Sequence, residues 1–285
     1  YLATAAIRAD GSSRFGANNR WGYFPSGSLA WRISEEDFLK DVSWMSNLKV
    51  RLSYGATGNN QIPNYGSIGV LGYSPYVSSG TVNQGIYTTN FADKNLKWEK
   101  TDQTNFGVDF SVLNGRVKFT GDIYYSKTKD LLLNVPIPIL SGFTSTLTNI
   151  GELENRGFEL NLSTRNFDDK FKWTTDFNIF ANRNKVLKLG TNDAPIDINV
   201  SSMTSRTAVG QPIGMYYGYV VDGVIMSQAE LDDYPVWPGS EAGDPKVRDV
   251  NSDGKIDSND RTYLGNNQAD FQWGITNNFS YEGFE

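Results

Sequence analysis

The chain has 285 residues, a formal net charge of −6 and a sequence pI of about 4.9. It contains neither cysteine nor histidine, which excludes disulfide bridges, thiolate nucleophiles, Cys/His zinc sites and every mechanism built on a histidine base. The acidic balance and the lack of a basic stripe in the sequence argue against a nucleic-acid partner.

Alternation of apolar and polar residues is the dominant pattern along the chain, and this pattern indicates β-strands. Leu48 and Val50, for example, share one face of a predicted strand, while Lys49 and Arg51 share the other. Strands are predicted, in chain order, at residues 1–8, 21–33, 47–57, 105–112, 116–125, 158–163, 171–179 and 271–281. The first two of these segments show the weakest alternation.

The connections between the predicted strands alternate between short and long. Asn114-Gly115 is a two-residue hairpin turn in which both positions tolerate positive φ, and the turn at 166–170 is also tight. Long loops are predicted at about 58–96, 129–154 and 184–270. Short turns on one side and long loops on the other are typical of outer-membrane barrels, whereas a soluble sandwich has no reason to place its long loops at one end.

The choice lies between a soluble sheet with one face on a core and a membrane barrel, since both alternate. Nearly every predicted strand carries charge on its polar face, and the strands have about the 9 to 11 residues that a tilted membrane-spanning strand needs. Aromatic residues gather near the strand ends, as in interfacial girdles. We therefore predict an all-β fold, a transmembrane antiparallel β-barrel. The chain lacks an initiator methionine and a signal peptide, so we expect it to be a fragment of a larger barrel.

Residues 249–260, DVNSDGKIDSND, have the spacing of a calcium-binding loop, with Gly254 at the sharp turn. The predicted Ca²⁺ ligands are Asp249, Asn251, Asp253, Lys255 through its backbone carbonyl, Asp257 and Asp260. The last ligand is Asp in place of Glu, a shorter side chain that weakens binding. A solvated Asp/Asn turn without an ion is the alternative. A bound ion would have a structural role, because it would stiffen a long loop.

Two apolar features of the predicted loops are candidate ligand or partner contacts. Trp237, between prolines in DDYPVWPGS, either contacts a ligand or anchors its own loop. The segment NVPIPILSGF (134–143) either forms an interface or folds onto neighbouring loops. Its candidate contact residues are Pro136, Ile137, Pro138 and Ile139.

No pattern in the sequence indicates an enzyme. The acidic pairs Glu35-Glu36 and Asp168-Asp169 lie in predicted turns on the short-turn side, where solvated carboxylates explain them better than acid/base catalysis. We therefore predict no catalytic residues and no cofactor other than Ca²⁺.

Four long stretches are RFGANNRWGYFPSGSLAWRISEEDF (14–38), LKVRLSYGATGNN (48–60), NLKWEKTDQTNFGVDF (95–110) and TNIGELENRGFELNL (148–162). Together with GMYYGYVVDGVI and GDPKVRDVNSDGKIDSNDRTYLGN, they resemble the SusC/RagA family of TonB-linked outer-membrane importers. The resemblance covers essentially the whole chain, keeps the order of the family, and is to the later part of the barrel domain.

This resemblance implies a plugged barrel of about 22 strands in the outer membrane of a Gram-negative bacterium, with the plug and the N-terminal domains outside this chain. It also implies import of an oligosaccharide or a peptide. The implied partners are a SusD-like surface lipoprotein that acts as a lid, the TonB complex acting through the plug, and outer-membrane lipid. A single-chain TonB receptor for a siderophore or vitamin, and a secreted calcium-stabilised carbohydrate-binding protein, remain alternatives.

Overall fold

A computed structural model of the chain describes residues 1–190, 192–201 and 203–284. The chain forms two compact units. We call Tyr1–Asn192 with Asp270–Glu285 the sheet unit, and Asp193–Ala269 the loop unit. No helix within the described ranges has both the length and the apolar character needed to cross a membrane.

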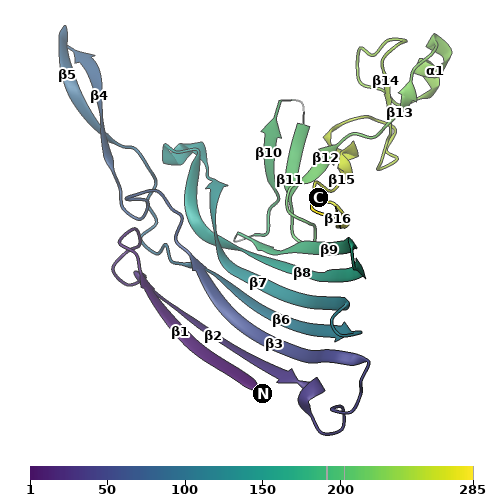
Figure 1. Ribbon diagram of the computed structural model, residues 1–285. Helices are drawn as coiled ribbons and strands as arrows, with labels where there is room; N and C mark the ends of the chain where they lie inside the picture. The colour runs from purple at the N-terminus through teal and green to yellow at the C-terminus, as the bar shows by residue number, and fades with distance from the viewer. Residues whose placement is uncertain (191, 202, 285) are drawn as a thin grey trace. The chain divides into compact units, whose positions relative to one another are not determined.

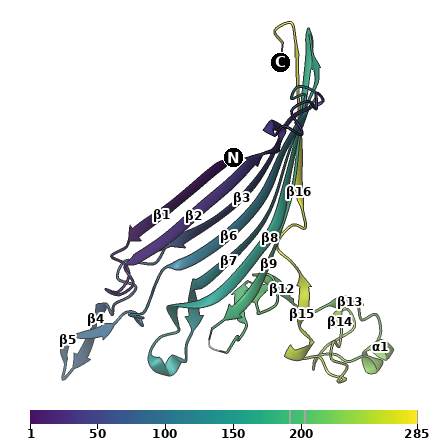
Figure 2. The same cartoon turned by 90° about the horizontal axis from the view of Figure 1, so that it is seen from below.

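The sheet unit is built on eight antiparallel strands in the order β1-β2-β3-β6-β7-β8-β9-β16 (Figure 1). These strands are β1 (Leu2–Gly11), β2 (Trp21–Arg32), β3 (Met45–Asn59), β6 (Glu99–Val112), β7 (Val117–Pro136), β8 (Ser145–Asp168), β9 (Phe171–Leu189) and β16 (Gln272–Tyr281). All eight predicted strands are present, and Figure 2 shows them running side by side. The sheet is open, with β1 and β16 at its edges.

One face of this sheet carries rows of apolar side chains. Strand register aligns Leu52, Phe106, Ile123 and Phe158 across β3, β6, β7 and β8. These four side chains are 48%, 41%, 58% and 37% exposed. A continuous row of exposed large apolar side chains is unfavourable in water and is what the lipid-facing side of a membrane barrel requires.

Aromatic residues border the apolar face near both ends of the strands. At the short-turn end, Phe167, Phe171, Trp173 and Phe279 pack with ring centroids 5.7 to 6.1 Å apart. Toward the long loops, the Tyr54 hydroxyl donates a hydrogen bond to Asp102 at 2.8 Å. Aromatic rings that pack on the apolar face while their hydroxyls contact charged groups are typical of the membrane interface. The sequence predicted this position for the aromatic residues near the strand ends.

Two of the predicted loops are shorter than expected because their flanking strands continue into them. The predicted loop 129–154 is mostly strand, since β7 extends to Pro136 and β8 begins at Ser145, with only a short 3₁₀ turn, η2 (Ile139–Ser141), near the tip. The register shifts between Lys129 and Leu132, around Asp130 with φ 57°. Such a bulge breaks the period of two, so alternation alone ends the strand too early.

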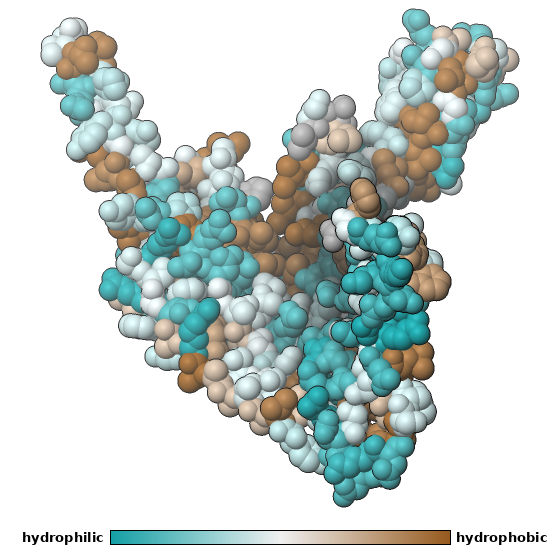
Figure 3. Space-filling model, in the orientation of Figure 1, coloured by the Kyte–Doolittle hydropathy of each residue, from teal (hydrophilic) through white to brown (hydrophobic). Residues whose placement is uncertain are grey.

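The predicted loop 58–96 contains a separate hairpin of β4 (Leu71–Ser78) and β5 (Thr81–Thr88), which pair only with each other in the described sheets. Leu71, Val77 and Val82 on this hairpin are 61% to 71% exposed. Figure 3 shows the corresponding brown surface along the projecting hairpin.

A small apolar core holds the base of these loops to the sheet. Phe15, Ile62 and Leu96 are buried, and Trp98, Leu132 and Leu147 pack against them. The Trp98 indole N–H also donates a hydrogen bond to the Arg20 carbonyl at 3.1 Å. The core joins segments distant in sequence to the extended β7–β8 hairpin.

The predicted loop 184–270 begins later, because β9 continues to Leu189, and most of it is folded. The loop unit contains a four-stranded sheet and a two-stranded sheet. Their strands are β10 (Ile196–Val200), β11 (Met203–Thr207), β12 (Met215–Gly218) and β15 (Thr262–Gly265), and β13 (Val221–Val224) and β14 (Pro245–Val247). Among the described residues, the helical segments besides η2 are η1 (Ile33–Glu35), α1 (Gln228–Asp233) and η3 (Ser258–Asp260).

The two faces of β8 allow a direct test of the lipid-facing assignment. Leu160 lies in the apolar row next to that of Phe158, and Asn161 lies on the opposite face. In the full-length protein folded into lipid vesicles, we expect Leu160→Arg to lower the free energy of unfolding by roughly 2–4 kcal/mol, the cost of an Arg at the bilayer midplane. Asn161→Arg should change it little. Urea unfolding measures both variants, and equal costs would contradict the assignment.

Candidate functional site

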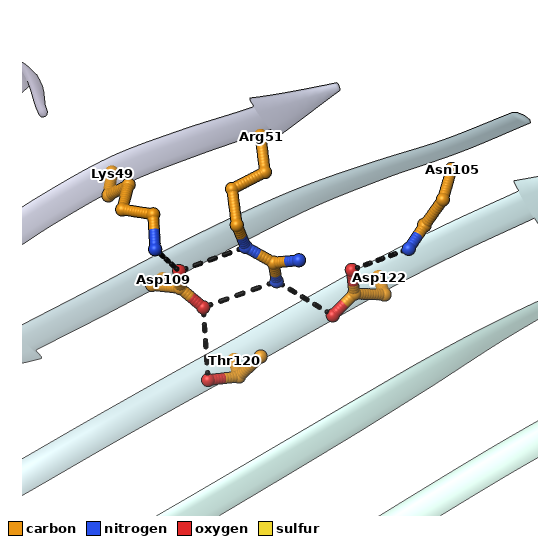
Figure 4. Close-up of polar contacts among 6 residues, drawn as sticks. All are labelled: Lys49, Arg51, Asn105, Asp109, Thr120 and Asp122. Atoms are coloured by element: carbon orange, nitrogen blue, oxygen red, sulfur yellow. Dashed lines mark hydrogen bonds and ion pairs between the residues drawn. The ribbon is translucent and has the colours of Figure 1, made fainter. Parts of the chain in front are cut away.

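The opposite face of the sheet carries a charged network centred on Arg51 of β3 (Figure 4). The Arg51 guanidinium donates hydrogen bonds to Asp109 at 2.9 and 3.2 Å and to Asp122 at 2.9 Å. Lys49 also lies 3.2 Å from Asp109. Thr120 and Asn105 donate further hydrogen bonds to the two carboxylates. Two cations and two carboxylates from three neighbouring strands thus neutralise one another.

Gly107 is the reason that Arg51 reaches Asp122. Arg51 of β3 and Asp122 of β7 both pair with Gly107 of β6, one from each side. A Cβ on Gly107 would lie 2.4 Å from the Asp122 carboxylate and 2.6 Å from the Arg51 guanidinium. The absent side chain therefore leaves the space that the long arginine side chain occupies.

A second polar ladder lies on the same face, nearer the long loops. The Tyr124 hydroxyl donates a hydrogen bond to Asn182 at 3.1 Å, and Asn182 donates one to Asn155 at 3.2 Å. Gly157 lies between Tyr124 and Asn182, where a Cβ would come within 2.6 Å of the Tyr124 hydroxyl. The polar face is thus a wall of amides, hydroxyls and mutually paired charges, which suits contact with water and polar solutes.

The predicted calcium loop forms a tight turn in the loop unit. The Asp249 carboxylate accepts a hydrogen bond from the Gly254 N–H at 2.8 Å, and Gly254 has φ 79°. Asp260 is fully buried and accepts N–H groups of Val250 and Asp257 at 3.0 and 2.7 Å. The Asp257 N–H in particular holds the pKa of the Asp260 carboxyl below its usual range.

The other predicted ligands are also engaged within the turn. Asn251 and Asp253 accept backbone N–H groups through their side chains, as does Asp257, and Lys255 donates its N–H to Asp253. Within the described ranges, no group of three or more acidic side chains is arranged to hold a metal ion. The loop therefore makes the sharp turn that the calcium-binding motif requires. Its side-chain oxygens, however, accept hydrogen bonds from backbone N–H groups. Calcium binding stays a prediction.

The two apolar candidates differ in their surroundings. Trp237 is half-buried and packs edge-on against Tyr219, with ring centroids 5.1 Å apart. Ile137 is half-buried and Pro138 exposed, while Ile139 is 79% exposed at the tip of the β7–β8 hairpin. The side chain of Pro136 lies outside the described part of the structure. Trp237 therefore packs against its own loop, and the hairpin tip is exposed. The ligand or partner contacts of both segments stay predictions.

Comparison with known proteins places this two-faced sheet in a family. The chain matches the family described as "TonB dependent receptor-like, beta-barrel" over residues 1–214. The chain belongs to this family. It is 37% identical over its whole length to TonB-dependent receptor SusC of Bacteroides thetaiotaomicron, and 36% identical to TonB-dependent receptor P3 of Formosa agariphila. It covers 29% of the length of each relative.

Solved structures agree with this assignment to the TonB-dependent receptors. The RagAB peptide importer in its closed-closed state superposes with a TM-score of 0.82 at 25% identity, over 99% of this chain and 30% of that one. The structure of the RagAB peptide transporter gives a TM-score of 0.81 at 26% identity. The predicted resemblance to SusC and RagA and the barrel fold are confirmed. The family consists of receptors and not enzymes, which confirms that prediction as well.

The charged network predicts a clear effect of removing Arg51. Asp109 and Asp122 are only 25% and 16% exposed, so Arg51→Ala would leave both carboxylates short of a partner. We expect a loss of about 1–3 kcal/mol in the free energy of unfolding of the full-length protein, measured by urea titration. Arg183→Ala is the control, because its partner Asp270 is 83% exposed. Equal losses would contradict the role of Arg51.

Proposed function

We propose that the chain is part of the barrel of a TonB-dependent importer in the outer membrane of a Gram-negative bacterium. The observation that carries this proposal is the sheet with one face of exposed apolar rows and the other of paired charges and amides. Lipid outside and an aqueous path inside account for both faces at once. The same apolar rows argue against the secreted, soluble carbohydrate-binding protein.

We infer further that the cargo is an oligomeric nutrient, an oligosaccharide or a peptide, and that a SusD-like surface lipoprotein closes over the barrel. The relatives support this inference, since one is SusC and another is named a peptide importer. The TonB complex would supply energy through a plug outside this chain. The exposed tip of the β7–β8 hairpin and the long loops would form the seat of the lipoprotein. A single-chain receptor for a siderophore or vitamin is the competing function.

Recovery of the partner tests the lidded importer. The full-length protein is purified from outer membranes in mild detergent, and co-purifying proteins are identified and quantified. We expect one surface lipoprotein in stoichiometric amount, because a lid has to stay with the barrel between transport cycles. Recovery of the barrel alone, under conditions that preserve other membrane complexes, would favour the single-chain receptor.

A variant of the hairpin tip locates the contact. Ile139→Ser with Leu140→Ser removes two side chains that are 79% and 101% exposed, so the fold of the barrel should not change. We expect lipoprotein recovery to fall at least about tenfold if the tip is a central contact, which corresponds to about 1.4 kcal/mol. Ile7→Ser on the edge strand β1, 73% exposed, is the control and should leave recovery unchanged. Unchanged recovery with the tip variant would exclude the tip as the seat.

We also propose that residues 249–260 bind one structural Ca²⁺ ion, using Asp249, Asn251, Asp253, the Lys255 carbonyl, Asp257 and Asp260. The tight turn at Gly254 supports this proposal. We expect a dissociation constant of about 10⁻⁴–10⁻³ M, typical of extracellular modules. Calorimetric titration of the full-length protein with Ca²⁺ measures it. Asp253→Asn should weaken binding, while Asp233→Asn on α1 should not; no saturable binding in the wild type would contradict the site.

A further inference from the structure

The loop unit contains a cavity of about 760 Å³ whose chemistry the proposed transport function does not yet use. Its main polar and aromatic lining residues are Asn199, Thr204, Tyr216, Tyr217, Tyr219 and Arg261. This volume lies within the range of pockets that bind small molecules or one end of a larger ligand. All of these residues belong to the same compact unit.

Arg261 is the charged group of this cavity, and it is half-buried. Its Nε donates a long hydrogen bond of 3.4 Å to the Tyr219 hydroxyl. Tyr219 is in turn held edge-on by Trp237 at 5.1 Å. Trp237 thus fixes the tyrosine that orients the guanidinium, so its packing role serves the cavity indirectly.

No carboxylate forms an ion pair with Arg261 in the described part of the chain. The neighbouring cation Arg206 differs, because it binds Asp197 through two hydrogen bonds of 2.7 Å. Arg206 also lies over the Tyr217 ring at 3.5 Å. Asp197 also attracts Arg261 at longer range. In the described ranges, however, no hydrogen bond or ion pair joins the two, so the Arg261 guanidinium keeps most of its donors for a ligand.

A half-buried guanidinium with its donors largely unused is suited to a planar carboxylate, which it binds with two parallel hydrogen bonds. The tyrosine rings offer flat apolar surfaces for the rest of such a ligand, and Asn199 and Thr204 offer an amide and a hydroxyl beside them. A neutral ligand would give this guanidinium no counter-ion, so an acid should bind more tightly than its neutral counterpart.

We propose that this cavity binds the carboxylate-bearing unit of the imported oligomer, with Arg261 as the group that recognises the acid. This inference rests on the proposed import function and narrows its substrate class to oligomers that carry a free carboxylate. The carboxylate has two sources, the C-terminus of a peptide or a uronic acid of an oligosaccharide. Both present the same planar anion to Arg261, and the experiment distinguishes them.

Two matched pairs of probes test the proposal by calorimetry on the full-length protein as it is recovered from outer membranes, with any protein that co-purifies. One pair is trialanine and trialanine amide, and the other is a digalacturonate and its methyl ester. We expect one of the two acids to bind at least about tenfold more tightly than its neutral counterpart. The pair that shows the difference identifies the source of the carboxylate. No preference in either pair, or no binding of any probe, would overturn the inference.

Variants assign the preference to Arg261. Arg261→Gln should remove the preference for the acid, so that the acid and its neutral counterpart bind about equally, while Arg261→Lys should keep part of the preference. Arg248→Gln is the control, since Arg248 forms an ion pair with Asp222 elsewhere in the loop unit and lies outside the cavity lining. Retention of the full preference by Arg261→Gln would overturn the proposal.

The test of the Arg261 cavity and the test of the lidded importer can fail independently of each other. Lipoprotein recovery is measured on the wild-type protein, whereas the preference for an acid is measured by comparing probes and Arg261 variants. If the lipoprotein co-purifies while acids and neutral probes bind equally, the cavity inference fails and the importer stands. If the barrel is recovered alone but Arg261 still selects an acid, the lidded importer fails and the cavity stands.

Discussion

Backbone hydrogen bonding between neighbouring strands is the constraint on which the rest of this structure depends, because lipid offers no partner for an unpaired N–H or C=O. Antiparallel pairing satisfies these groups and at the same time fixes the register. The register sends Leu52 and Ile123 to one face and Arg51 and Asp122 to the other. A slip of one residue in any strand would place charged side chains against lipid. The pairing of the strands therefore also determines which side chains face lipid.

On the polar face of the sheet, the charged side chains of the Arg51 network bind one another, so none of them is isolated. Arg51 reaches across β6 because Gly107 has no side chain, and it meets carboxylates from two strands. Tyr124 and Gly157 repeat the arrangement with neutral groups. Charged groups that bind each other leave little charge free to hold a polar solute. Arg261 in the loop unit differs in this respect, because its charge has no carboxylate partner among the described residues.

Alternation of side chains was sufficient to predict the eight strands of the sheet, since a period of two is a property of each strand by itself. It failed at Asp130, where a bulge changes the face on which residues lie, and so the β7–β8 extension was missed. The partners of Arg51 were also beyond sequence reasoning, because they depend on which residues meet across strands. The fold of residues 193–269 was not foreseen for a similar reason: its strands are only three to five residues long, too short to show a period.

The loop unit enters and leaves the sheet through β9 and β16, which are hydrogen-bonded neighbours. A hairpin connection of this kind fixes only the two ends of whatever lies between them, and insertions at such sites are well tolerated. Changes in the intervening segment leave strand pairing in the bilayer untouched. The sheet can therefore stay constant while this segment diversifies, and exchange of the segment between related proteins would be a direct route to new ligand-binding surfaces.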